Sequence, residues 1–112
     1  MNGQDLYLER SEKEHLLNVA IRELSQRGRA FAAAERDYRV ALAQKMLMER
    51  ENKIPVTIIS DICRGNPEIA ALRFERDVAE AMYKSALEAI NAYKLQIRII
   101  ESQIDREWSR AQ

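Results

Sequence analysis

Apolar residues recur at seven-residue spacing along the second half of the chain. One series is Tyr83, Ile90, Ile97 and Ile104, and the other is Ala79, Ala86, Tyr93 and Ile100. Together they give the alternating steps of three and four residues that form a coiled-coil seam. Asn66 is a favourable N-cap, and Pro67 suits the first helical position, where its missing N–H costs nothing. The pattern predicts one helix over residues 67–110.

The first half of the chain carries a similar but less regular pattern. Its main series is Leu17, Leu24, Phe31 and Tyr38, with Ile21, Ala34 and Leu42 between them. This series predicts a helix over about 5–51. Gly28 interrupts it, at a cost of about 1 kcal/mol relative to alanine in a helix interior. Gly28 marks either a bend or a close helix crossing, and the sequence leaves open whether the helix is continuous there.

The segment 52–66 joins the two predicted helices and forms an elbow. It contains Pro55 and Gly65, yet it is too apolar for an ordinary loop. We expect Thr57 to cap a short helix over 58–63 that Gly65 terminates. The apolar residues of the elbow are Ile54, Val56, Ile58, Ile59 and Ile62. They require burial, either as part of the core or against a partner.

These elements predict a single all-α domain over residues 1–112. Its architecture is a long antiparallel helical hairpin, similar to a coiled coil, with a short helical elbow. Pairing the two long helices from the elbow outward places Phe31 opposite Ala86 and Ala89. The same pairing places Tyr38 opposite Met82 and Ala79, so that large residues meet small ones.

The second long helix is apolar on more than one side. Leu95 and Ile99 point nearly opposite Ile97, at 100° per residue. A helix that is apolar on two sides is usually buried on two sides. We therefore expect a homodimer of hairpins that forms a four-helix bundle. The alternative is a docking surface for another protein. In both cases Leu95 and Ile99, with the five apolar elbow residues, are the candidate partner-binding residues.

The charge of the chain is balanced. Lys and Arg total 18, as do Asp and Glu, so the formal net charge is zero. This balance removes the usual electrostatic argument for binding nucleic acid or an anionic membrane. Three glycines and two prolines leave little of the chain for turns, as expected of long helices. No stretch approaches the ~20 apolar residues of a membrane span or shows a targeting pattern, so we expect a cytoplasmic protein.

No combination of residues predicts catalysis. Cys63 is the only cysteine and His15 the only histidine, and an antiparallel hairpin would hold them far apart. We expect Cys63 to be a small buried hydrophobe. Glu12 and His15 have the Glu-x-x-His spacing of carboxylate metal sites, but this motif is short and lies among charged residues. We therefore expect a non-enzymatic protein without a metal or other cofactor.

The first helix is locally basic. Its candidate nucleic-acid-binding residues are Arg22, Arg27, Arg29, Arg36 and Arg39, which could follow a phosphate backbone. Interspersed acidic residues favour an ordinary helix surface with i,i+4 ion pairs, such as Glu35–Arg39 and Arg73–Asp77. A nucleic-acid accessory protein is therefore the alternative to a protein-binding role.

Four segments of the elbow and second helix resemble small helical proteins encoded by phages and prophages of Gram-positive bacteria. They are Pro55–Gly65, Arg76–Glu80, Tyr83–Arg98 and Gln103–Trp108. The resemblance covers about half the chain, and that family has no established activity from which site residues could be transferred. It implies a protein in the cytoplasm of a bacterial host that binds a host or phage protein. A role in phage recombination or replication is the other implication.

Overall fold

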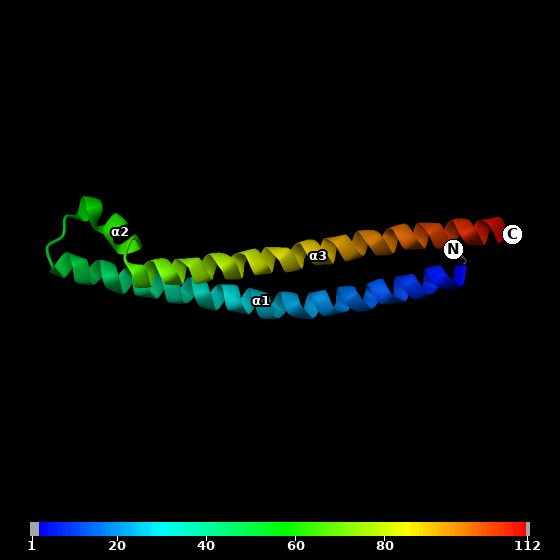
Figure 1. Ribbon diagram of the computed structural model, residues 1–112, viewed down its shortest axis with the longest axis horizontal. Helices are drawn as coiled ribbons and strands as arrows, with labels where there is room; N and C mark the ends of the chain where they lie inside the picture. The colour runs from blue at the N-terminus through cyan, green and yellow to red at the C-terminus, as the bar shows by residue number, and fades with distance from the viewer. Residues whose placement is uncertain (1–2, 112) are drawn as a thin grey trace. The chain divides into compact units, whose positions relative to one another are not determined.

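The computed structural model describes residues 3–111, which form three helices (Figure 1). They are α1 (Gly3–Glu51), α2 (Val56–Arg64) and α3 (Pro67–Ala111), and the described residues include no strand. The prediction of an all-α chain is thus confirmed, and α1 is unbroken at Gly28. The chain divides into two compact units. Unit 1 combines the residues up to Gln26 with those from Lys84 onward, and unit 2 is Arg27–Tyr83.

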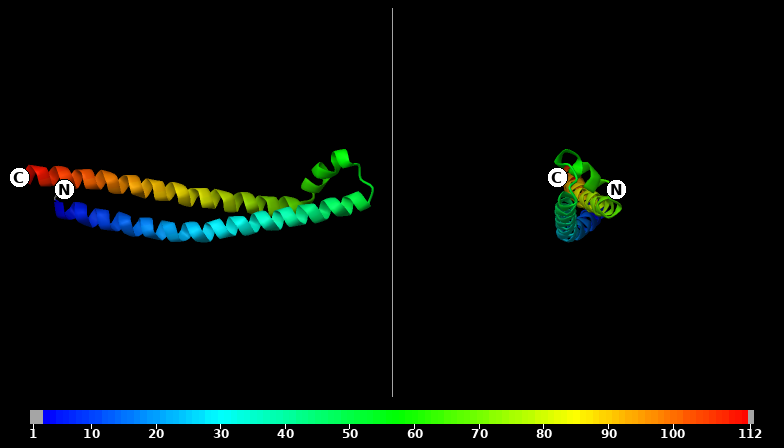
Figure 2. Two further views of the ribbon diagram at one scale, coloured as in Figure 1. Left: turned by 180° about the vertical axis from the view of Figure 1, so that it is seen from behind. Right: turned by 90° about the vertical axis from the view of Figure 1, so that its left-hand side faces the viewer.

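Within each unit, α1 and α3 lie side by side and run in opposite directions, which is consistent with the predicted hairpin (Figures 1 and 2). The predicted seam of α3 faces inward. Its buried members are Ala86, Ile90, Ile100 and Ile104, and its half-buried members are Ala79, Tyr83, Tyr93 and Ile97. The two heptad series therefore identified the face of α3 that packs against α1.

The core of unit 1 includes a cluster of Leu6, Ile100 and Ile104. On α1, Ala20 is buried, whereas Ile21 is 47% exposed. The assignment of Ile21 to the seam was therefore wrong. The two positions lie about 50° to either side of the line through Leu17 and Leu24, and α3 packs on the side of Ala20.

The pairing of α1 with α3 in unit 2 is shifted from the prediction. Phe31 packs against Tyr83, with ring centroids 6.1 Å apart, whereas the prediction placed it opposite Ala86 and Ala89. Tyr38 lies under Arg76, whereas the prediction placed it opposite Met82 and Ala79. In each case the partner lies about one turn closer to the start of α3 than predicted.

The elbow explains this shift. Asn66, just before α3, lines the same hollow as Lys45, so the last turn of α1 extends beyond the start of α3. The elbow helix α2 has nine residues, Val56–Arg64, and is longer than the predicted 58–63. Figure 2 shows α2 turned back from the end of α1 toward the start of α3. The extra helical residues change the point at which the two long helices begin to pair.

The ends of the helices are fixed by local hydrogen bonds. Lys53 takes a positive φ of 65°, and the N–H of Ile54 donates to the carbonyl of Glu49 at 3.1 Å, which ends α1 in a Schellman-type turn. At the start of α2 the N-cap is Pro55 and no side chain caps the helix, so the predicted capping by Thr57 was wrong. At the start of α3, the Asn66 Oδ1 accepts hydrogen bonds from two backbone N–H groups, as an N-cap should.

Replacing Gly28 with alanine is expected to stabilise the protein by about 1 kcal/mol, because glycine is unfavourable in a helix interior. A Cβ at this position would meet the nearest Tyr83 ring atom at 3.5 Å, which is ordinary contact. Thermal unfolding should show a rise in Tm of about 4 °C. Gly3→Ala is the control, because Gly3 begins α1 in open space and should change Tm little. A lower Tm for Gly28→Ala would mean that α1 and α3 cross more closely here than the structure shows.

Candidate interaction surfaces

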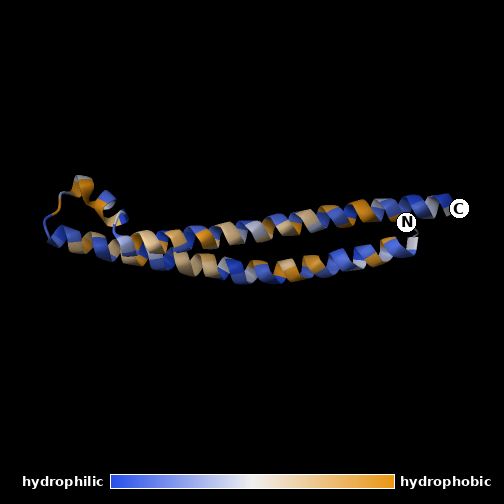
Figure 3. Ribbon diagram, in the orientation of Figure 1, coloured by the Kyte–Doolittle hydropathy of each residue, from blue (hydrophilic) through white to orange (hydrophobic). Residues whose placement is uncertain are grey.

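The second apolar face predicted for α3 is exposed. In unit 1 it presents Leu95 and Ile99, and in unit 2 it presents Phe74 and Val78. Leu95 follows Phe74, and Ile99 follows Val78, by a whole number of heptads, so these residues occupy the same two heptad positions of α3. Figure 3 shows hydrophobic and hydrophilic residues interspersed along α3. The exposed positions therefore form a second seam, which we call the outer face of α3.

Small side chains occupy most of the outer face between these apolar residues. Exposed Ala81, Ser85 and Ala92 continue the same heptad positions, and Glu88 is the charged exception. Small side chains let a neighbouring helix approach closely, while the large ones at either end supply apolar area. The face thus has the composition of a helix-packing surface and not of a solvated one.

The elbow helix α2 is apolar on two neighbouring faces. Ile59 is 4% exposed and packs inward, whereas Ile58 and Ile62, one turn apart, are 45% and 43% exposed. Ile59 therefore packs in the core, which is one of the two alternatives that the sequence left open for the elbow residues. Of the other two elbow candidates, Val56 is exposed and Ile54 is half-buried. The accessible apolar surface of the elbow consists of Val56, Ile58 and Ile62.

Cys63 lies one turn after Ile59 on the inward face of α2 and is fully buried. The prediction that it is a small buried hydrophobe is confirmed. A thiol in this position adds to packing and is not available to a substrate.

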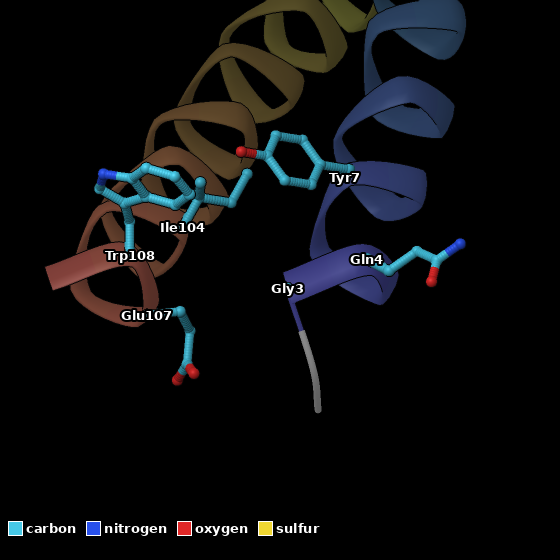
Figure 4. A pocket seen from close by; sticks show the side chains of 6 residues that line it. All are labelled: Gly3, Gln4, Tyr7, Ile104, Glu107 and Trp108. Atoms are coloured by element: carbon cyan, nitrogen blue, oxygen red, sulfur yellow. The ribbon is translucent and has the colours of Figure 1, made fainter. Parts of the chain in front are cut away.

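A cleft opens in unit 1 between the start of α1 and the end of α3 (Figure 4). It holds about 450 Å³. The Tyr7 side chain points across it toward α3, where the Trp108 indole lies beside Ile104, while the Glu107 carboxylate points away. Trp108 and Tyr7 are both exposed. The cleft gives unit 1 a further apolar surface, and the sequence pattern did not single out Tyr7.

Arginines from all three helices meet in unit 2. Arg39 of α1, Arg64 of α2, and Arg73 and Arg76 of α3 line a hollow of about 270 Å³, together with Tyr38 and Leu42. We call it the arginine hollow. Tyr38 is buried and Leu42 half-buried, so these two side chains form its floor.

Arg76 is held by three neighbours. Its guanidinium carbon lies 4.7 Å from the centre of the Tyr38 ring, a cation–π contact. Its Nη2 donates to Asp77 Oδ1 at 2.9 Å, and its Nη1 lies 3.4 Å from Glu35 Oε2. The same Glu35 accepts a hydrogen bond from Arg39. Arg76 is thereby fixed in one orientation at the edge of the hollow.

The contacts of Arg76 and Glu35 stabilise the charged forms of both side chains. The hydrogen bond to Asp77 raises the pKa of Arg76, and the hydrogen bond from Arg39 lowers the pKa of Glu35. Glu35 is therefore ionised at neutral pH. The predicted Glu35–Arg39 pair is confirmed, but Asp77 pairs with Arg76, so the predicted Arg73–Asp77 pair was wrong.

The five arginines predicted to follow a nucleic acid do not converge on one site. Arg27 donates to the carbonyl of Met82 at 3.1 Å, and Arg36 donates to Asp37. Arg22 and Arg29 are exposed on α1. Of the five, only Arg39 lines the arginine hollow.

The sequence reasoning missed the other three arginines of the hollow. Arg64, Arg73 and Arg76 belong to two helices and share no motif spacing. One signal was present: Arg76 occupies the inward position between Leu72 and Ala79 in the heptad pattern of α3. A charged residue at an inward heptad position indicates a specific partner.

Glu12 and His15, the residues of the Glu-x-x-His motif, are both exposed on α1. Within residues 3–111, no three His, Cys, Asp or Glu residues are grouped so that they could hold a metal ion. In the same part of the chain, none of the helices has an apolar stretch sufficient to cross a membrane.

Comparisons with protein-family models, with curated proteins and with solved structures find no match to this chain. We therefore infer the function of the chain from its exposed surfaces and their chemistry.

Proposed function

We propose that this chain is a non-enzymatic protein that works through protein–protein contacts, and that its first partner is a second copy of itself. The two hairpins would pair along the outer face of α3 to form a four-helix bundle. The observation that carries the proposal is the second heptad seam, with Phe74, Val78, Leu95 and Ile99 exposed. An exposed seam of this kind is normally covered by another helix.

The surface area of the chain supports the same proposal. It exposes 8306 Å², whereas a folded monomer of 13.0 kDa typically exposes about 6,300 Å². The excess is about 2,000 Å² per chain, which is comparable to the area that obligate homodimers bury. Within residues 3–111, ten apolar residues are buried, whereas sixteen large hydrophobic residues are exposed. Association would bury apolar area that the single chain leaves in water.

The elbow is a second surface for the same kind of function. Val56, Ile58 and Ile62 are exposed on or beside α2 in unit 2. The resemblance to phage and prophage proteins suggests that a host or phage protein binds there, in the cytoplasm of a bacterium. The alternative, a nucleic-acid accessory role for α1, has weaker support, because Arg27, Arg36 and Arg39 already have partners within the chain.

The double variant Leu95→Glu/Ile99→Glu tests the proposal. Two carboxylates on the outer face would be desolvated in a dimer, so the variant should be monomeric under conditions in which the parent is a dimer. Light scattering measures the mass. The matched control is Asn91→Glu/Gln96→Glu, which adds the same charge at exposed polar positions of α3. The proposal fails if both variants have the mass of the parent dimer, or if the control dissociates as readily as the test variant.

A further inference from the structure

The arginine hollow contains more positive charge than the neighbouring carboxylates neutralise. Four guanidinium groups line it, whereas the carboxylates in contact with them are Glu35 and Asp77. Both carboxylates are engaged with Arg39 and Arg76. Within the described residues, the side chains of Arg64 and Arg73 make no ion pair or hydrogen bond. Like charges held close together repel one another, and a bound anion would relieve this repulsion.

The hollow is also organised for binding. Tyr38 and the carboxylates of Glu35 and Asp77 hold Arg76 in place, so its orientation does not depend on a ligand. Arg39 uses its Nε toward Glu35 and keeps its two terminal nitrogens for other acceptors. Arg64 ends α2 and approaches from a different helix. Donors that arrive from three helices can surround a compact anion, whereas a row on one helix can only follow an extended one.

We propose that the arginine hollow binds a phosphoryl group, as a free small molecule or at the end of a larger one. Guanidinium groups match the oxygen geometry of phosphate through paired N–H donors. The hollow, at about 270 Å³, is slightly smaller than the ~300 Å³ at which pockets for drug-sized ligands begin. A phosphate or diphosphate fits this size. This site is separate from the outer face of α3 and does not depend on association of the chain.

Binding is tested by titrating pyrophosphate into the full-length protein and measuring the heat released at low ionic strength. We expect saturable binding to the parent. Arg64→Gln/Arg73→Gln should weaken it by roughly 100-fold, about tenfold for each charge-assisted contact. The control is Arg22→Gln/Arg29→Gln, which removes the same charge from exposed positions on α1 outside the hollow and should bind as the parent does. Circular dichroism verifies that both variants remain helical.

A further comparison shows whether the phosphoryl group belongs to a free small molecule or to the end of a larger one. A short single-stranded oligonucleotide with a 5′-phosphate is compared with the same strand lacking it. Tighter binding of the phosphorylated strand supports a site for a terminal phosphoryl group, and binding of pyrophosphate alone supports a free small molecule. The proposal is overturned if pyrophosphate does not bind the parent, or if the two double variants lose binding equally. It is also overturned if both strands bind alike and more tightly than pyrophosphate, because the surface would then recognise a phosphodiester backbone.

Discussion

Ile100→Ala is expected to lower the free energy of unfolding by about 2–5 kcal/mol, the range for truncating a buried isoleucine. Ile100 is 4% exposed and belongs to the core cluster with Leu6 and Ile104. Its neighbour Ile99 is 50% exposed on the outer face of α3. Ile100→Ala and Ile99→Ala remove the same atoms from adjacent positions, so a comparison of the two variants isolates the effect of burial. Denaturant unfolding followed by circular dichroism measures both.

The dependence of the free energy of unfolding on protein concentration distinguishes the two variants further. The loss of stability in Ile100→Ala should be the same at every protein concentration, because it arises within one chain. The loss for Ile99→Ala should appear only where the protein is associated and should vanish on dilution. If Ile99→Ala costs as much as Ile100→Ala in dilute protein, the inward and outward faces of α3 have been assigned incorrectly.

The elbow offers a second matched pair with a large expected effect. Ile59→Ala should destabilise the protein by about 2–4 kcal/mol, because Ile59 is buried beside Cys63 on the inward face of α2. Ile58→Ala should cost less than about 0.5 kcal/mol, because Ile58 remains accessible to water. Thermal unfolding of the two variants measures the difference.

This pair also decides how much of the elbow is core. If Ile58→Ala destabilises as strongly as Ile59→Ala, then α2 is enclosed on both faces, and the elbow is not a binding surface. If neither substitution has an effect, α2 does not pack against the long helices in solution. Only the expected asymmetry leaves Val56, Ile58 and Ile62 available to a partner.

The inward face of α3 could be predicted because its apolar residues follow a single seven-residue period. Seven-residue spacing repeats over many turns, so the positions of Ile90, Ile100 and Ile104 reinforce one another. The same seven-residue spacing separates Leu95 and Ile99 from the inward face. On α1 the pattern is shorter and interrupted, and it could not distinguish Ala20 from Ile21, which flank the seam symmetrically.

The pairing of helices and the arginine hollow could not be derived from periodicity. Pairing depends on where the chain reverses, and this is set by the Schellman-type turn at Lys53 and by the length of α2. A heptad pattern is unchanged when a helix slides by one turn, so it does not report such a shift. The hollow combines Arg39, Arg64 and Arg73 from three helices. Their proximity follows from the pairing and is not encoded in any local spacing.

Molecular mass in solution, measured by light scattering over a wide range of protein concentration, decides whether two hairpins associate. We expect a mass near twice the 13.0 kDa of one chain. We also expect the dimer to persist at high salt, because apolar contacts are not screened as charges are. A mass near 13.0 kDa at every concentration would rule out self-association. The outer face of α3 would then be exposed in the free protein, and a second copy of the chain would not be its partner.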